Sequence, residues 1–177
     1  MKSLKSSPTI IVLIIVALCL GVAVAYALTV GQTVQNVELR DAENNPKMIP
    51  ALGTKLVSLF YNDADASDLN DPLADALKAK NFPKDKYEGF GIANLKDSKA
   101  PNFLIRKIIQ GKIKKYNTTI LTDPDLILAK AWDLGDCNNT SVVMFIGKDM
   151  KVKYVYKGAV RGEEINKVVK MVEDLIK

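Results

Sequence analysis

The sequence predicts an α/β protein in which helices cover both faces of a central mixed β-sheet. Short apolar runs that suit buried strands alternate along the chain with amphipathic stretches that suit helices. Near the C-terminus two apolar runs are joined by a short turn, and a last amphipathic stretch follows them. Alternating units favour parallel strands, while a terminal hairpin adds antiparallel ones, so we expect a mixed sheet.

The expected strands are short runs of apolar residues bounded by turn-forming residues. The segment 41–47 is rich in Asp, Asn and Pro and predicts a turn after the first strand, while residues 148–150 join the two strands of the hairpin. The expected strands cover residues 37–40, 55–61, 88–95, 118–123, 141–147 and 151–157.

The expected helices follow from apolar residues that recur every three or four positions. Asp68 is expected to be the N-cap of the first helix, with Pro72 in its first turn. Pro101 suits the first turn of the second helix because its missing N–H is not needed there. The apolar stripes of these two helices consist of Leu69, Leu73 and Leu77, and of Ile105, Ile109, Ile113 and Tyr116. The expected helices cover about 68–81, 101–116, 126–132 and 162–176.

This order of elements resembles the thioredoxin fold, in the extended form seen in peroxiredoxin-like and TlpA-like proteins. Four stretches also resemble the YtfJ-like family of bacterial periplasmic proteins, and its most specific motifs are those at Asn70-Asp71-Pro72-Leu73 and Pro101-Asn102-Phe103. The resemblance implies a thioredoxin-like fold, a periplasmic location and no established activity. The four stretches are 59–73, 94–109, 130–134 and the final hairpin and helix.

The N-terminus predicts export. Lys2 and Lys5 precede the apolar segment 9–28, which ends in small alanines. This pattern is typical of a bacterial secretory signal that is cleaved after Ala25 or Ala27. The apolar segment is also long enough to span a bilayer, so an uncleaved anchor in the inner membrane is the alternative.

The domain boundaries follow from that segment. Residues 1–27 are interpreted as a signal peptide or N-terminal membrane anchor, and 28–177 as a single thioredoxin-like domain facing the periplasm. Cys19 does not fit a lipidation site well, because the large Leu18 precedes it where a small residue is usual.

The composition excludes several classes of function. The formal net charge is +5, and two of the positive charges lie in the N-terminal segment. So mild a surplus does not indicate a nucleic acid partner. The chain has no histidine, which removes the commonest metal ligand and the usual general base, so a Ser-His-Asp or Cys-His site cannot be built from this chain alone. We expect no cofactor.

Cysteine usage argues against ordinary thiol–disulfide chemistry. Of the two cysteines, only Cys137 lies outside the N-terminal segment, and the sequence contains no Cys-x-x-Cys pair. A thioredoxin-like redox site would carry its cysteine pair after the strand 55–61, where this chain has aspartates. The loop before the strand 141–147 also lacks the proline that is usual there, with Asn139, Thr140 and Ser141 near that position.

The acidic junction after the strand 55–61 allows two interpretations. Oxygen ligands at this density suit a hard cation, and Asp63, Asp65 and Asp68 are the candidate ligands. An EF-hand pattern begins there, but it fails because Asp68 stands where glycine is required and Ala74 where glutamate is required. The alternative is a solvated loop whose carboxylates favour the positive end of the following helix.

The surfaces expected to bind a partner are the loops 63–71 and 135–141, because ligands of open α/β sheets bind beyond the carboxyl ends of strands. Cys137 is a weak catalytic candidate, since Asp133 and Asp136 would raise the pKa of its thiol. The candidate binding residues are Asp63, Asp65, Asp68, Asn70, Asp71, Asn138 and Asn139.

Two further features have ordinary explanations beside functional ones. The basic side of 101–116 could dock on an acidic partner or on anionic lipid headgroups, but a solvated helix face explains it as well. Trp132 is expected to anchor the core. The basic side consists of Arg106, Lys107, Lys112, Lys114 and Lys115.

The leading hypothesis is an exported thioredoxin-like domain that binds a periplasmic protein or a small ligand without catalysis. The partners are not expected to include nucleic acid, and membrane contact is expected only through the N-terminal segment if it is uncleaved. One alternative is a single-cysteine thiol reductase or peroxidase that uses Cys137. Another is a divalent-cation-binding module at the acidic loop 63–71.

Overall fold

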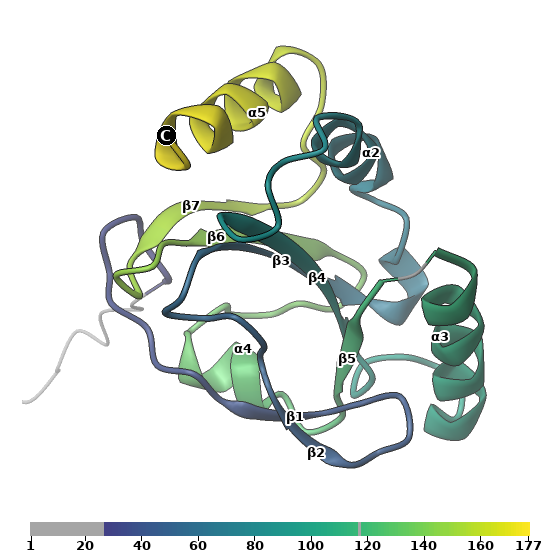
Figure 1. Cartoon of the computed structure of the whole chain (residues 1–177). Coiled ribbons are helices and arrows are strands. Elements are labelled where there is room, and N and C mark those ends of the chain that lie inside the picture. Colours follow the sequence, from purple (N-terminus) through teal and green to yellow (C-terminus); the bar gives the residue numbers. More distant parts are fainter. Residues whose placement is uncertain (1–26, 117) are drawn as a thin grey trace, which may run out of the picture.

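A computed structural model of the chain describes residues 27–116 and 118–177. Its strands form one seven-stranded sheet in the order β2-β1-β5-β4-β3-β6-β7 (Figure 1). Strands β3, β4 and β5 pair in parallel, and the other pairs are antiparallel, as expected for a mixed sheet. The strands are β1 (Glu38–Arg40), β2 (Pro46–Met48), β3 (Leu56–Asp63), β4 (Tyr87–Asn94), β5 (Ile120–Asp123), β6 (Ser141–Ile146) and β7 (Val152–Lys157).

The helices lie in the predicted order between and after these strands. A single 3₁₀ turn, η1, follows β3 directly, and the next helix is entered through a further turn over residues 67–70. The elements are η1 (Ala64–Ala66), α2 (Asp71–Ala79), α3 (Asn102–Tyr116), α4 (Ile127–Ala131) and α5 (Glu163–Leu175).

Strand β6 shows why the sheet is covered on both faces. Successive side chains of a strand point to opposite faces, and every residue of β6 is buried. Val142, Met144 and Ile146 pack into one core, while Val143 and Phe145 pack into the other. A strand buried on both sides therefore has the continuous apolar sequence from which it was predicted.

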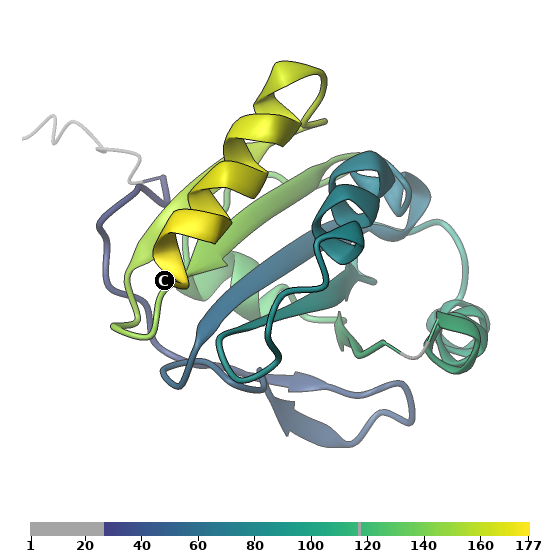
Figure 2. The ribbon, with the colours of Figure 1, turned by 45° about the horizontal axis from the view of Figure 1, so that its top comes forward.

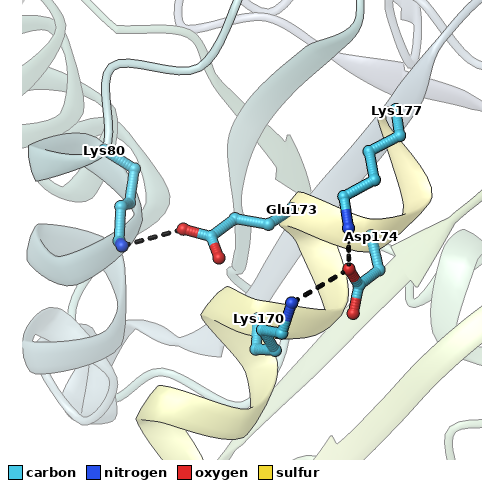
Figure 3. A network of polar contacts seen from close by, with 5 residues as sticks. All are labelled: Lys80, Lys170, Glu173, Asp174 and Lys177. Carbon is cyan, nitrogen blue, oxygen red and sulfur yellow. Dashed lines mark hydrogen bonds and ion pairs between the residues drawn. The ribbon is translucent and has the colours of Figure 1, made fainter.

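On one face of the sheet, α2 and α5 lie side by side (Figures 1 and 2). Leu73 and Leu77 of α2 join the valines of α5 in one buried cluster. At the exposed rim, Lys80 Nζ lies 2.8 Å from Glu173 Oε1 and links the two helices (Figure 3). Because such surface ion pairs are screened by water, the buried apolar residues hold the layer together.

The opposite face is covered by α4 and by the N-terminal lead-in. Trp132, directly after α4, is only 2% exposed, and its indole Nε1–H donates to the carbonyl of Gln35 at 2.9 Å. The prediction that Trp132 anchors the core is confirmed. The lead-in is tied to β7 by the N–H of Gly31, which donates to the carbonyl of Val152 at 2.8 Å.

Helix α3 packs beside β5, apart from the other helices (Figure 2). Ile105 and Ile109 of its predicted apolar stripe are buried against Leu95 and Ala42, with Ile113 packed beside them. The stripe is therefore correct for these positions, whereas the side chain of Tyr116 is outside the described part of the chain.

Asp68 is not the N-cap of the first helix, so that prediction is wrong. The N–H of Asp71 donates to the carbonyl of Asp68 in a turn, and the helix begins only at Asp71. Asn70 takes the N-cap position, but its side chain makes no capping hydrogen bond. Leu69 consequently lies outside the helix. Asp68 is exposed and available to solvent.

The described residues include no helix that is both long and apolar enough to cross a membrane. The predicted signal peptide or anchor falls almost wholly on residues 1–26, outside the part of the chain that the structure describes. Export and cleavage therefore stay predictions.

Candidate functional site

Three parallel strands end side by side in buried polar residues. In the register of the sheet, Asp63 of β3 pairs with Asn94 of β4, and Asn94 pairs with Asp123 of β5. All three side chains are fully buried. They form a polar row at the carboxyl edge of the sheet, where ligands of open α/β sheets bind.

Asp63 joins two loops that are far apart in the sequence. Its Oδ1 accepts the N–H of Asp65 at 2.9 Å and caps η1, while its Oδ2 accepts the N–H of Asn139 at 2.7 Å. Its own N–H donates to the carbonyl of Thr140 at 3.0 Å. The carboxylate therefore holds the loop before β6 against the end of β3. Each of its oxygens already accepts a hydrogen bond from the protein.

Asn94 and Asp123, which the sequence analysis did not single out, hold their own loops in the same way. Asn94 Oδ1 accepts the N–H of Lys96 at 2.9 Å, and its Nδ2 donates to Asp97 Oδ2 at 2.7 Å. The sequence gives one signal that Asn94 and Asp123 hold the following loops: each residue ends an apolar run, and turn residues follow.

Asp123 is the buried acceptor at the start of α4. Its two oxygens accept the N–H groups of Ile127 at 2.7 Å and Leu128 at 3.0 Å, and the Tyr61 hydroxyl donates to it at 3.2 Å. Burial raises the pKa of the Tyr61 phenol strongly, and the charge of Asp123 raises it further. Tyr61 therefore stays a neutral donor to this carboxylate.

Asn70 connects the start of α2 to β6 and to the loop after β7. Its Nδ2 donates to Ser141 Oγ at 2.8 Å and to the carbonyl of Gly158 at 2.9 Å, and its Oδ1 accepts the N–H of Val160 at 2.8 Å. Gly158 has a φ of 112°, which favours glycine and turns its carbonyl toward Asn70. Asn70 is 2% exposed, so it is a structural link and not a residue of a binding surface.

Cys137 lies in the apolar core beneath the same edge of the sheet. It is 3% exposed, and its Sγ lies 3.5 Å from the carbonyl oxygen of Gly135. Burial raises the pKa of its thiol; Lys157 opposes the shift and Asp136 adds to it. The predicted direction is correct, but desolvation is the larger cause, and the expected contribution of Asp133 is absent.

The remaining predicted binding residues form an exposed polar rim above this buried layer. The acidic members come from η1, the turn after it and the first residue of α2, and the amides come from the loop before β6, which Asp63 holds in place. Burial and then the charge of Asp68 raise the pKa of the Asp71 carboxyl, and Lys112 of α3 opposes this. The rim consists of Asp65, Asp68, Asp71, Asn138 and Asn139.

The predicted cation ligands divide between the two layers. Asp63 is buried, whereas Asp65 and Asp68 are exposed. Within residues 27–116 and 118–177, no three side chains of Asp, Glu, Cys or His are grouped so that they could hold one metal ion. Nothing in the geometry adds support to the cation-binding hypothesis, which stays a prediction.

The residues of the predicted basic side of α3 fall into two groups, those bonded to other segments and those exposed to solvent. Arg106 is half-buried, with Nη1 donating to the carbonyl of Asp41 at 3.1 Å and to Thr122 Oγ1 at 2.7 Å. Lys112 Nζ reaches Ser67 Oγ at 3.4 Å. Lys107 and Lys114 are exposed, and the side chain of Lys115 is not described.

Sequence comparison identifies the family. Residues 53–175 match the family described as bacterial protein of unknown function, YtfJ_HI0045. The chain belongs to this family. Relatives include the uncharacterized protein YtfJ of Escherichia coli K12 and an uncharacterized protein of Haemophilus influenzae, each 26% identical over 114 residues. Those alignments cover 63% of this chain and 61% of each relative.

Solved structures identify the fold as thioredoxin-like. The thioredoxin domain of a thiol-disulfide oxidoreductase from Bacteroides vulgatus superposes with a TM-score of 0.59 and 15% identity, over 85% of this chain and all of that one. A peroxidoxin from Mycobacterium tuberculosis gives 0.56 and 18%, over 85% and 99%. The thioredoxin-like fold predicted from the sequence is therefore confirmed.

Removing the Asn70 side chain is expected to destabilise the protein. Asn70→Ala leaves the buried N–H of Val160 and the carbonyl of Gly158 without their partner, so we expect a loss of about 3 kcal/mol. Urea unfolding followed by circular dichroism measures it. Asn138→Ala, an exposed amide in the facing loop, is the control and should change stability by less than about 0.5 kcal/mol. Equal losses in the two variants would contradict the role given to Asn70.

Proposed function

We propose that this chain is an exported thioredoxin-like domain that binds a partner and performs no thiol–disulfide exchange. The observation that carries the proposal is the buried pair of Asp63 and Asn70 at the junction of β3 and α2. A Cys-x-x-Cys site depends on a thiolate near the start of a helix. Here the corresponding junction is filled by hydrogen bonds that hold the fold together.

The state of Cys137 supports the same conclusion. A reactive cysteine has a lowered pKa and is accessible to its substrate. Cys137 is buried, and its thiol has a raised pKa because burial disfavours the thiolate. Among the described residues it is the one cysteine, so it has no resolving partner there. These properties weigh against the single-cysteine reductase or peroxidase.

The polar rim is the surface that we propose for binding. It combines three exposed carboxylates with two exposed amides on loops that Asp63 joins. Such a surface suits a partner that presents cationic or hydrogen-bond-donating groups, either a segment of another protein or a small ligand. The buried hydrogen bonds beneath the rim already hold both loops in place, so we expect a partner to bind without rearranging them.

The packing of Leu28 is compatible with removal of the predicted signal. Leu28, which follows the predicted cleavage site at Ala27, is 6% exposed, and its N–H donates to the carbonyl of Asp133 at 3.3 Å. Cleavage after Ala25 or Ala27 would leave this packing intact.

Alkylation of Cys137 tests the absence of thiol chemistry. In the full chain carrying Cys19→Ser, we expect alkylation at least about tenfold slower in the folded protein than in urea, with a pH midpoint above the free value of about 8.5. The protein should not accelerate reduction of insulin by dithiothreitol. Asn138→Cys is the control, because an exposed thiol one residue away should react at once. Insulin reduction that Cys137→Ser abolishes would refute the proposal.

Expression of the full chain in a Gram-negative bacterium tests export. We expect the protein in the periplasmic fraction, with an N-terminus at Tyr26 or Leu28 by sequencing or mass spectrometry. An intact N-terminus in the membrane fraction would support the anchor, and cytoplasmic accumulation would contradict export altogether.

Affinity capture from a periplasmic extract tests the rim. A specific partner should be retained by the wild type and lost, by about tenfold or more, on the combined substitutions Asp65→Asn, Asp68→Asn and Asp71→Asn. Asp85→Asn and Asp133→Asn serve as controls, because they neutralise exposed carboxylates outside the rim and its loops. Capture that is the same for both sets would show that the rim is not the binding surface.

A further inference from the structure

The outer face of α3 exposes large apolar side chains without a partner in the described chain. Phe103 is 69% exposed, Ile108 61% and Leu104 43%. Helical spacing places Phe103 and Leu104 on the side away from the buried Ile105 and Ile109, and Ile108 on the flank next to Leu104. Contiguous exposed apolar residues of this size mark an interaction surface more often than a solvated one.

The charges around these side chains are basic. Lys107 and Lys114 lie on the same exposed side of α3, and Lys99 lies just before its start, all exposed. The sequence of α3 contains no acidic residue. Exposed acids also lie nearby: Glu43 accepts a hydrogen bond from Gln110 at 3.3 Å, and Glu38 Oε1 lies 4.0 Å from Arg40 Nη1.

A groove of about 690 Å³ lies beside the N-terminal turn of α3, between the β1–β2 hairpin and the loop after β5. Arg40, Arg106 and Phe103 line it, together with one acid, Asp125. Nη1 of Arg106 is held by Asp41 and Thr122, while its Nε and Nη2 have no hydrogen-bond partner among the described residues. The guanidinium is thus fixed in position and still has donors to offer.

The two arginines are close enough to affect each other. Burial lowers the pKa of the Arg106 guanidinium; Asp41 opposes the shift and the charge of Arg40 adds to it. Since both groups remain charged at neutral pH, two like charges face one groove. An anion between them would relieve that repulsion and could accept from both.

We propose that the outer face of α3 docks on membranes that contain anionic phospholipid. Phe103, Leu104 and Ile108 enter the boundary between headgroups and acyl chains, and the neighbouring lysines reach the phosphates. The groove of Arg40 and Arg106 accepts one headgroup phosphate. This proposal rests on the removal of the N-terminal segment described under the proposed function.

Lipid fits this surface better than an acidic protein does. Lysine is depleted at protein–protein interfaces, because its flexible, strongly hydrated ammonium is costly to bury. Membrane-surface helices instead combine lysine with Phe, Leu or Ile, since the lysine stem packs on the apolar layer while its charge stays in water. The outer face of α3 has that combination.

Because of the position of α3, docking on a membrane requires that the N-terminal segment has been removed. The lead-in is bonded to β7 at one end of the sheet, whereas α3 packs beside β5, four strands away from β7 in the sheet order (Figures 1 and 2). An uncleaved anchor ending at Leu28 would hold the β7 end near the bilayer and keep α3 away from it. The processed chain has no such constraint.

Co-sedimentation with phospholipid vesicles tests the proposal, using the protein recovered from the periplasm. We expect binding to vesicles of equal parts phosphatidylglycerol and phosphatidylcholine, weaker binding to phosphatidylcholine alone, and loss of binding in salt that screens surface charge. Phe103→Ser with Ile108→Ser should weaken binding by about tenfold or more. Val30→Ser with Tyr156→Ser is the control, because it removes two exposed apolar residues at the β7 end.

An environment-sensitive fluorophore distinguishes docking by α3 from attachment by the N-terminus. It is placed on Ile108→Cys or Tyr156→Cys in the Cys19→Ser chain, where Cys137 is shielded. Anionic vesicles should shift the emission of the label at position 108 to the blue and leave that at 156 unchanged. No binding, binding that the Phe103 and Ile108 substitutions leave intact, or an aqueous spectrum at position 108 would each overturn the proposal. Export and cleavage are scored separately by the N-terminus of the same protein.

Discussion

The arrangement of the carboxyl edge of the sheet depends on two buried side chains that bond across the chain. Asp63 holds the loop before β6, and Asn70 holds β6 and the loop after β7. In a low-dielectric interior, buried polar groups stabilise the fold only if each of them has a hydrogen-bond partner. The described part of the chain leaves no buried side-chain nitrogen or oxygen without a partner. This edge is therefore rigid and specified by its polar groups as much as by its apolar core.

That constraint also supports the proposal that the edge carries no thiol–disulfide exchange. A thioredoxin-like redox site needs an accessible thiolate at this junction, but here acceptor side chains are committed to backbone N–H groups. The one described cysteine lies below the edge, within the apolar core. What the edge offers to solvent is an outer rim of carboxylates and amides on loops that Asp63 joins, which is the surface proposed for binding.

The two proposed surfaces differ in charge and in shape. The polar rim is acidic and lies over the carboxyl edge of the sheet, while the outer face of α3, the helix beside β5, is basic and apolar (Figure 2). Lys112 lies between them and reaches Ser67 across the gap. A domain with two unlike surfaces could hold a partner at one while resting on a membrane through the other.

The sequence by itself predicted the order of the helices, the fold class and every strand except β2, because burial on one or both faces leaves a periodic apolar pattern, whereas all three residues of β2 are exposed. It also indicated which loops meet the carboxyl edge. Tertiary structure alone decided which polar residues are buried: Asp63 and Asn70 look like Asp65 and Asp68 in the sequence, yet the first two are bonded to segments some 70 to 90 residues away. The stripe of Ile105, Ile109 and Ile113 already placed Phe103 and Ile108 off the predicted buried side, but only the tertiary structure shows that no other described element covers them. Burial depends on contacts between distant segments, and local pattern does not contain them.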